Sequence, residues 1–256
     1  MQESAYDDLF NAEDKHWWYL GLYDLVQLSC RRLFIERSLR ILDLGCGTGG
    51  LLNILANNGY KVKGVDISEN ALAYCRKRGL KRLILANLND WSPETDRYDV
   101  ITCMDVLYHD WIKDEVQILK SLSNGLKREG ILILNLPAFP ILQRGHDNVV
   151  MGKRRYTKSM IYNNLSRSQL VPILFTYRLP HAYFPLLLKR LLEVVRGRTA
   201  HSSDIKDISC FNPVLYAVNR LENRIILNGL SLPFGTSVFV IARKMANNHI
   251  KSFNSL

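Results

Sequence analysis

The stretch Ile41–Gly50, which reads ILDLGCGTGG, decides the fold that we expect for this chain of 256 residues. Its first half is apolar and ends in a run of glycines, and from Leu51 to Leu55 the apolar residues recur at helical spacing. Glycine lets a backbone turn tightly and approach a ligand closely. The free N–H groups that begin a helix favour a carboxylate or a phosphate. The stretch therefore predicts a buried strand, a ligand-binding turn and a helix.

The same alternation of apolar strands and amphipathic helices continues toward the C-terminus. Further strands are expected at 61–66, 82–86, 98–103, 130–135, 170–178 and 237–243. Helices are expected between them, and Ser68 and Thr157 carry hydroxyls that suit a helix N-cap. This order indicates an α/β fold. We expect a doubly wound, mostly parallel seven-stranded sheet that binds its ligand beyond the carboxyl ends of the strands.

Two helical regions accompany this core. An apolar stripe between Leu22 and Leu33 predicts an N-terminal helical segment, and apolar residues recur every three or four positions from Phe184 to Val195. The predicted division is an N-terminal helical cap at 1–36, a cofactor-binding core at 37–179 and 236–245, and a C-terminal helical cap insertion or lid at 180–235. The insertion is amphipathic, so it suits a membrane surface, a cover over an apolar substrate, or ordinary packing on the core.

An acidic residue, Asp66, ends the second predicted strand about twenty residues after the glycines. A carboxylate at this position can accept hydrogen bonds from both hydroxyls of a ribose. The alternative is a helix N-cap, but Ser68 fills that role better. Proteins that bind NAD use the same combination of glycine turn and acid, and the spacing of GCGTGG does not exclude them.

The segment LDLGCGTG resembles motif I of class I S-adenosylmethionine (SAM)-dependent methyltransferases, which have a Rossmann-like methyltransferase fold. The resemblance implies that SAM is the cofactor and S-adenosylhomocysteine the product. It implies that the loop backbone faces the methionine part of SAM, that Asp43 fixes the loop and the amino group, and that Asp66 binds the ribose. Many relatives carry Asp where Asn87 stands, to accept from the adenine amino group. The candidate cofactor-binding residues are Asp43, Gly45, Cys46, Gly47, Thr48, Gly49, Asp66, Ile67, Asn87, Leu88, Asn89, Met104, Asp105 and Val106.

The fourth predicted strand runs into Met104–His109, which reads MDVLYH. In the family this loop often ends in Val-Leu-Glu-His, so Tyr108 replaces the common Glu and His109 matches. Imidazole has a near-neutral reference pKa, so His109 suits a general base during methyl transfer, and Tyr108 is a second catalytic candidate. The alternative is that His109 only orders the loop, because methyl transfer from a sulfonium can proceed by positioning alone.

Segments outside the core resemble a narrower bacterial subfamily of these methyltransferases, with HWW and HDxxxGxxRRYT motifs. The chain departs from that pattern at Leu22-Tyr23, where basic residues are usual, and at Lys153, where His is usual. The aromatics Trp17, Trp18 and Tyr19 suit closure over SAM, or a staple that packs a helix on the sheet. The tentative substrate contacts His146, Arg154, Arg155 and Tyr156 suit a phosphate or carboxylate, or a loop held by salt bridges.

Charge points to an anionic partner. The formal net charge is +10, and residues 144–220 hold 13 Lys and Arg against 4 Asp and Glu. A basic surface of this kind suits a phosphate-bearing substrate, an anionic membrane face or nucleic acid, or simply aids solubility. Five cysteines without a CxxC pair indicate a reduced protein with buried thiols and no zinc site. The N-terminus does not read as a signal peptide and no long apolar run occurs, so we expect a cytoplasmic protein that can also lie at the inner face of the membrane.

These features favour methyl transfer to a small-molecule or lipid-linked acceptor, with an amphiphilic or anionic acceptor as the best fit. Oxygen is the favoured acceptor atom, and carbon and nitrogen are alternatives. An RNA methyltransferase is a competing hypothesis, although the tetrapeptide NPPY or DPPY is absent after the fourth predicted strand. A SAM-binding, membrane-associated protein without turnover is another, and an NAD-dependent dehydrogenase is a weaker one. The sequence gives no oligomeric state.

Overall fold

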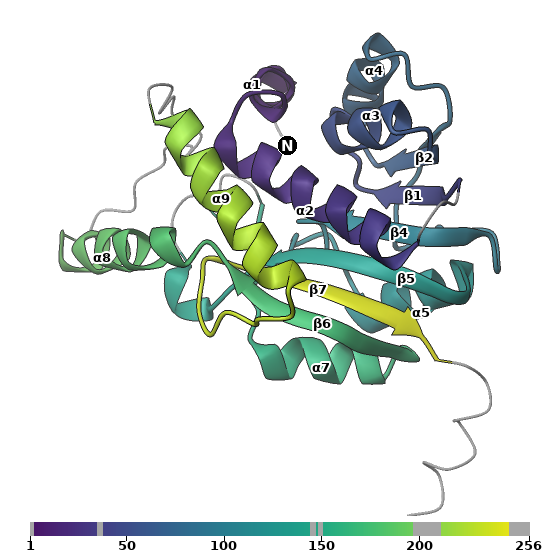
Figure 1. The fold of residues 1–256 in the computed structure, drawn as a ribbon. Coiled ribbons are helices and arrows are strands. Elements are labelled where there is room, and N and C mark those ends of the chain that lie inside the picture. Colours follow the sequence, from purple (N-terminus) through teal and green to yellow (C-terminus); the bar gives the residue numbers. More distant parts are fainter. Residues whose placement is uncertain (1–2, 35–37, 144–146, 148–150, 197–210, 246–256) are drawn as a thin grey trace, which may run out of the picture.

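The computed structural model describes residues 3–34, 38–143, 147, 151–196 and 211–245. They build one seven-stranded sheet in the order β3-β2-β1-β4-β5-β7-β6 (Figure 1). The strands are β1 (Arg40–Leu44), β2 (Lys61–Asp66), β3 (Leu83–Leu85), β4 (Tyr98–Met104), β5 (Leu126–Pro137), β6 (Leu170–Arg178) and β7 (Ser237–Lys244). Only β7 runs antiparallel to its neighbours, β5 and β6. The doubly wound, mostly parallel seven-stranded sheet predicted from the sequence is therefore confirmed.

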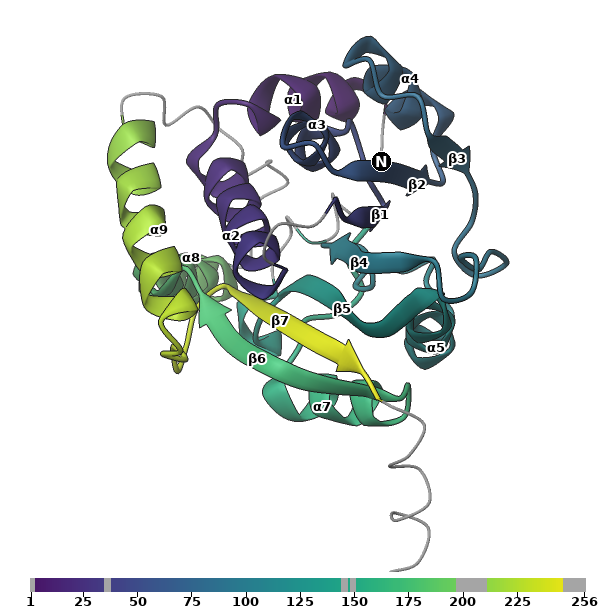
Figure 2. The same cartoon turned by 45° about the vertical axis from the view of Figure 1, so that its right-hand side comes forward.

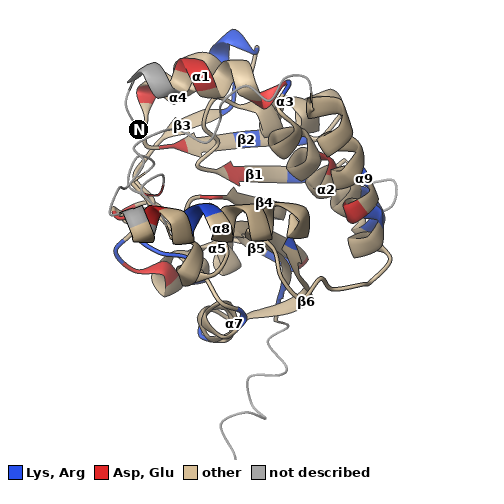
Figure 3. Cartoon of the chain, turned by 90° about the vertical axis from the view of Figure 1, so that its left-hand side faces the viewer, with Lys and Arg blue, Asp and Glu red and all other residues tan. Residues whose placement is uncertain are grey.

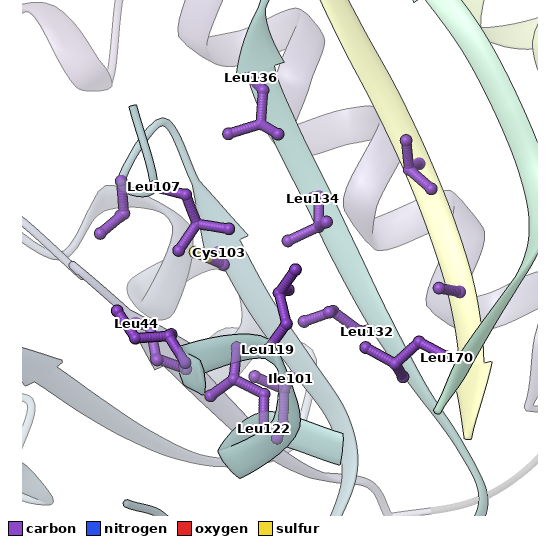
Figure 4. Close-up of a cluster of buried hydrophobic side chains, with 14 of the residues drawn as sticks. Leu44, Ile101, Cys103, Leu107, Leu119, Leu122, Leu132, Leu134, Leu136 and Leu170 are labelled. Carbon is purple, nitrogen blue, oxygen red and sulfur yellow. The ribbon is translucent and has the colours of Figure 1, made fainter. Parts of the chain in front are cut away.

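Helices cover both faces of the sheet (Figures 1 and 2). They are α1 (Glu3–Glu13), α2 (Trp17–Leu33), α3 (Gly50–Asn57), α4 (Glu69–Lys77), α5 (Glu115–Gly125), α7 (Lys158–Ser166), α8 (Pro180–Arg196) and α9 (Asn212–Leu227), with a short 3-10 helix at Pro140–Leu142. Leu119 and Leu122 of α5 pack against Leu132 and Leu134 of β5 on one face (Figure 4). Helices α2, α3 and α9 pack on the other face. This two-sided cover explains why the central strands read as continuous apolar runs.

Helix N-caps appear where the hydroxyl residues predict them. Ser68 Oγ accepts a hydrogen bond from Ala71 N at 3.3 Å, and Thr157 Oγ1 accepts one from Met160 N at 3.4 Å. The N-terminal helical pattern, in contrast, is two helices. His16 separates them, because its backbone is extended and its Nδ1 accepts from Trp18 N as the N-cap of α2.

Two strands differ in length from the expectation by more than one residue. The third strand is shorter, and β5 begins at Leu126 and ends at Pro137, beyond both expected limits. Leu126 pairs with Tyr98 ahead of a register shift in the β4–β5 ladder, and the last residues of β5 pair with β7. These pairings extend the strand past the apolar run, which is what hydrophobic patterning detects.

Helix α9, within the region predicted as a lid, lies directly along α2 (Figures 1 and 2). Asn219 Nδ2 donates to Trp17 O at 3.1 Å, and Asn223 Nδ2 donates to Gly21 O at 2.8 Å. A Cβ on Gly21 would lie 2.3 Å from Asn219 Nδ2, so glycine is needed for this close crossing. Helix α9 thereby joins the helical layer on the sheet, where Ile226 is fully buried. The division into cap, core and insertion stays a prediction.

Helix α8 extends away from the sheet (Figure 1). Within the described part of the chain, no helix is both long and apolar enough to cross a bilayer. Four of the five cysteines lie in the described ranges; all are buried and none is disulfide-bonded: Cys30, Cys46, Cys75 and Cys103. Buried free thiols at these positions were expected from the sequence. The fifth, Cys210, lies outside the described residues.

Candidate active site

The glycine turn after β1 has the geometry that the sequence predicts. Gly45, Gly47 and Gly49 have φ values of 63°, 54° and 86°, in the left-handed region that favours glycine. A Cβ on Gly45 would lie 2.3 Å from Cγ2 of Val106, so the turn also presses against the loop that follows β4. Gly45 N and Cys46 N both donate to the carbonyl oxygen of Val65, at 2.8 and 3.1 Å. The turn is therefore fixed between the ends of β1, β2 and β4.

Asp66 lies directly beside this turn. One carboxylate oxygen accepts from Gly47 N at 2.9 Å, and the other accepts from Ser68 N at 2.9 Å. The side chain is nearly buried, and loss of hydration raises the pKa of the carboxyl above its usual value, while the hydrogen bonds from Ser68 and Gly47 oppose the shift. The two features that were predicted to bind one nucleoside thus meet at a single edge of the sheet.

The residues after β3 form a small polar network. Asn87 Oδ1 accepts from the backbone N and from Nδ2 of Asn89, at 3.0 and 2.9 Å. Asn89 also donates to Trp111 O and accepts from Lys113 N. Leu88 is buried, whereas Ile67, which follows Asp66, is 47% exposed. Ile67 therefore offers an accessible apolar surface next to Asp66. The side-chain amide oxygen of Asn87 already accepts two hydrogen bonds.

Asp43, two residues before the first glycine, is buried beneath the turn. Its Oδ1 accepts from Thr102 Oγ1 of β4 at 2.7 Å. Burial is the main cause that raises its pKa to about 7, the Thr102 hydrogen bond opposes the shift, and the charges of Glu13 and Asp66 add to it. Asp43 thus fixes β1 to β4 through one hydrogen bond and places a third carboxyl close to the turn.

Glu13, at the end of α1, is a site residue that sequence reasoning missed. It is buried and accepts hydrogen bonds from Thr48 Oγ1 and from Gly50 N, the latter at 2.9 Å. Tyr23 donates its hydroxyl to the other oxygen at 3.0 Å, and Arg78 lies 3.3 Å away. A carboxylate at the start of α3 is stabilised by the helix dipole. Helix α1 is thereby attached to the glycine turn.

The loop after β4 begins at Asp105, whose φ of 54° is unusual for a residue with a side chain. Asp105 N donates to Asn135 O at 2.8 Å, and Asn135 Nδ2 donates to the Asp105 carboxylate at 2.8 Å. Burial raises the pKa of Asp105 to about 7, which the Asn135 hydrogen bond and the charges of Arg178 and Arg155 oppose. Backbone strain combined with a buried carboxyl is typical of a functional position.

Tyr108 and His109 stack at the end of the same loop. Their ring centroids are 4.3 Å apart, and His109 also stacks on Trp111 at 5.9 Å. His109 Nδ1 lies 3.4 Å from Met151 O. Gly152 leaves room for the Tyr108 ring, since a Cβ there would lie 2.7 Å from Cε2. The two catalytic candidates are thus held by aromatic contacts, and their roles stay predictions.

The N-terminal aromatic cluster lies at the same edge. Trp18 contacts Tyr19 edge to face at 4.9 Å, and Trp17 contacts His181 of α8 at 5.6 Å. Burial is the main cause that raises the pKa of Tyr19, and the negative charges of Glu13 and Asp105 add to it. Tyr19 is therefore within electrostatic reach of both Glu13 and Asp105.

The basic motif after β5 is held by ion pairs. Arg155 donates to Asp147 from Nε and Nη2, both at 3.1 Å, and both side chains are buried. Arg154 pairs with Glu115. Tyr156 is 1% exposed and donates its hydroxyl to Leu107 O at 3.0 Å. These contacts match the salt-bridged loop that was the alternative interpretation. Predicted His146 lies outside the described residues, and a substrate role for this motif stays a prediction.

A second group of buried polar residues that the sequence motifs do not identify lies at the end of β6. Arg178 has no exposed surface, and its charge lowers the pKa of His181, although loss of hydration is the larger cause. Glu222 of α9 approaches Arg178 Nε to 3.8 Å. No motif identifies these residues, because Arg178 and Glu222 are 44 positions apart and meet only through the packing of α9 on the sheet.

A comparison with protein families identifies part of the chain. Residues 41–130 match the model of a family described as a methyltransferase domain. The match begins in β1 and ends in β5, and so contains the glycine turn, Asp66 and the loop after β4. The narrower subfamily that the HWW and RRYT motifs resemble stays a prediction.

Individual relatives support the same assignment. A ubiquinone biosynthesis O-methyltransferase of Haemophilus ducreyi is 26% identical over 123 residues, which are 44% of this chain and 50% of that protein. A trans-aconitate 2-methyltransferase of Variovorax paradoxus is 33% identical over 109 residues, 41% of each protein. The chain thus spans about half the length of these curated relatives, or less.

Solved structures share the fold. A SAM-dependent methyltransferase from Mesorhizobium loti superposes with a TM-score of 0.57 at 18% identity, covering 86% of this chain and 98% of that one. The chain therefore has the fold of this SAM-dependent methyltransferase, and its residues 41–130 match a methyltransferase-domain family.

Proposed function

We propose that this chain transfers the methyl group of SAM to a small-molecule acceptor, with oxygen as the favoured acceptor atom and carbon or nitrogen as alternatives. The observation that carries the proposal is the hydrogen bond between Gly47 N and the Asp66 carboxylate at 2.9 Å. It brings the turn suited to an amino-acid tail next to the acid suited to a ribose.

The residues present fit such a cofactor. Asp66 can accept hydrogen bonds from the ribose hydroxyls while it keeps its two backbone donors, because each carboxylate oxygen has a second lone pair. The left-handed glycines leave the turn without side chains that would obstruct the methionine part. Exposed Ile67 offers an apolar wall to an adenine ring. When bound, SAM supplies an electrophilic methyl group on a sulfonium.

The chain's own contribution to the reaction is orientation. The loop from Asp105 to His109 is fixed to β5 by Asn135 and to the cofactor turn by the contact of Val106 with Gly45. An acceptor held on this loop is therefore positioned relative to the turn, which supplies much of the rate in a direct displacement. His109 and Tyr108 are the groups proposed to take the acceptor proton, with their rings fixed by stacking.

Titration calorimetry with S-adenosylhomocysteine tests the cofactor site. Asp66→Asn removes the charge that strengthens the ribose hydrogen bonds, so we expect binding at least about tenfold weaker. Glu69→Gln is the matched control, since Glu69 is an exposed acid three residues away that pairs with Arg76. Equal affinities of Asp66→Asn and the native protein, or no heat with the native protein, would contradict the proposal.

The same experiment separates turnover from binding alone. A SAM-binding protein without turnover gives the calorimetric signal but no S-adenosylhomocysteine when SAM is supplied with extracts of small molecules. An NAD-dependent dehydrogenase gives a signal with NAD instead. Accumulation of S-adenosylhomocysteine only in the presence of extract supports the methyltransferase.

An RNA methyltransferase is a second candidate, favoured by one basic cavity. This cavity has a volume of about 430 Å³ and lies at the amino ends of the strands; its lining includes Arg40, Lys61, Lys63, Arg82 and Arg97. The glycine turn lies at the opposite, carboxyl ends. An RNA phosphate in the cavity would thus be on the far edge from the cofactor site, so we favour the small-molecule acceptor. Tight, salt-sensitive binding of bulk tRNA would reverse this preference.

An apolar or lipid-linked acceptor is supported by α8. One face of this helix exposes Phe184, Leu188, Leu191 and Val195, each more than half exposed. Basic residues accompany them on the helix (Figure 3). Such a face suits the surface of an anionic bilayer. We expect sedimentation with anionic vesicles, reduced by Leu188→Asp and unaffected by Lys120→Asp at an exposed position of α5. Absence of sedimentation would leave a water-dissolved acceptor.

A further inference from the structure

Arg178, the last residue of β6, carries a buried charge that no hydrogen bond neutralises. Its side chain has no exposed surface. Its Nε, Nη1 and Nη2 atoms have no hydrogen-bond partner among the described residues. Glu222 Oε1 lies 3.8 Å from Nε, which is an ion pair without a hydrogen bond. Both oxygens of Glu222 accept instead from Leu179 N, at 3.0 and 3.2 Å.

Two more buried donors lie in the same place. The ring nitrogens of His181 and the Nε1 atom of Trp17 also have no hydrogen-bond partner in the described part of the chain. The rings of Trp17 and His181 are 5.6 Å apart, and His181 is within electrostatic reach of Arg178. Donors from the end of β6, the start of α8 and the start of α2 therefore converge.

This arrangement is costly without a ligand. Buried polar groups are hydrogen-bonded in native proteins, and a buried charge without hydrogen bonds destabilises the fold. The backbone around Arg178 is nonetheless closely packed. Gly235, which precedes β7, leaves room for the Arg178 backbone, since a Cβ there would lie 1.9 Å from Arg178 O. An unpaired guanidinium in a closely packed region indicates that a ligand supplies the missing hydrogen-bond acceptors there.

The missing group must supply acceptor atoms. A guanidinium offers five N–H donors in a planar fork that matches the two oxygens of a carboxylate or phosphate. Trp17 and His181 can each add one donor. A cationic group would be repelled by Arg178, and a single neutral hydroxyl has too few lone pairs for these donors. The carboxyls of Glu222 and Asp105 are also within electrostatic reach of Arg178. An anion must therefore hydrogen-bond the guanidinium directly to offset repulsion from these carboxyls.

The site lies on the acceptor side of the cofactor turn. Asp105, within electrostatic reach of Arg178, begins the loop whose Val106 presses on Gly45. We propose that Arg178, with Trp17 and His181, binds an oxyanion of the methyl acceptor, a carboxylate or a phosphate. The inference rests on the proposed function only where it assigns the oxyanion to the methyl acceptor. Arg178 is fully covered in this structure, so binding requires the elements around it to open.

Calorimetry at constant ionic strength tests the site with two probes, inorganic phosphate and malonate, against chloride. Each titration is run with and without saturating S-adenosylhomocysteine. The test variant is Arg178→Gln combined with Glu222→Gln, which removes both charges and leaves neither unpaired. The control is Arg220→Gln, an exposed arginine on the same helix as Glu222. We expect oxyanion binding to weaken at least about tenfold in the test variant and to change less than twofold in the control.

A response to phosphate alone assigns a phosphate, and a response to malonate alone assigns a carboxylate. If the double variant does not unfold cooperatively, Trp17→Phe, which removes one donor and keeps an aromatic ring, is expected to weaken binding about threefold or more. Equal oxyanion binding in native and test proteins, or none in the native protein, would overturn the inference. Failure of S-adenosylhomocysteine to bind overturns the proposed function instead, and the titrations without it still decide whether the oxyanion site exists.

Discussion

Replacing Gly45 by alanine tests how tightly the cofactor turn is built. The φ of 63° costs an alanine about 1–2 kcal/mol, because a left-handed backbone crowds its Cβ. The new Cβ would lie 2.3 Å from Val106 Cγ2, far inside normal carbon contact, and such overpacking costs about 1–3 kcal/mol. We expect Gly45→Ala to lower the free energy of unfolding by about 2–5 kcal/mol in all.

The two contributions can be separated by a second substitution. Val106→Ala removes the atom that collides with the new Cβ but leaves the backbone strain. In a double-mutant cycle by urea unfolding, the pair Gly45→Ala and Val106→Ala should show a favourable coupling of about 1–3 kcal/mol. Binding of S-adenosylhomocysteine should stay weak in the single and the double variant that carry Gly45→Ala, since both keep an alanine at a left-handed position of the turn. A loss below about 1 kcal/mol for Gly45→Ala, with no coupling to Val106, would refute the geometry argued for the turn.

Three further predictions follow from buried groups. The raised pKa of Asp105, about 7 in the folded chain against 3.8, means that its protonated form stabilises the fold below about pH 4 and that this stabilisation is lost as the pH rises to about 7. Relative to Asp105→Asn, the unfolding free energy of the native protein should therefore fall between about pH 4 and pH 7 and then stay level. A difference in urea unfolding between the two proteins that stays constant from about pH 4 to pH 7 would contradict this prediction. Gly21→Ala should destabilise the protein although alanine favours helices, because the Cβ would collide with Asn219, and adding Asn219→Ala should restore part of the melting temperature; a rise in melting temperature for the single variant would show that α2 and α9 are not in close contact. Tyr23→Phe removes one donor from the buried Glu13 and should cost about 1–3 kcal/mol of unfolding free energy, whereas Tyr162→Phe at an exposed position should cost less than about 0.5; equal losses would argue against the hydrogen bond.

Local signals in the sequence predicted most of the fold and the glycine turn beside Asp66, whereas the binding of SAM by these residues stays a prediction. Asp66 was assigned a site role because it ends an apolar strand shortly after a glycine turn, and the structure brings its carboxylate to Gly47. The N-caps Ser68 and Thr157 were predictable because capping depends only on the next three residues. Strand limits were less accurate, because β5 is extended by pairing with strands that patterning does not consider.

The remaining site residues depend on contacts between distant parts of the chain. Glu13 reads as one acid among several in a polar N-terminal segment, and its place at the start of α3 follows from how α1 folds back on the turn. Arg178 reads as the end of a strand, and its burial requires α9 to lie on the sheet. A loop held by salt bridges was one of two alternatives that the sequence left open for the motif after β5, without indicating that Asp147 would pair with Arg155. A single sequence carries no signal for contacts of this kind between distant residues.

The attachment of α1 to the glycine turn couples the start of the described chain to any ligand that binds this turn. Since Glu13 bonds to Thr48 and to Gly50, a ligand that orders this turn must also restrain α1, and by thermodynamic reciprocity a restrained α1 must tighten the ligand. Cleavage by a protease between α1 and α2 would then slow as S-adenosylhomocysteine is added, so the N-terminal helix would report cofactor occupancy.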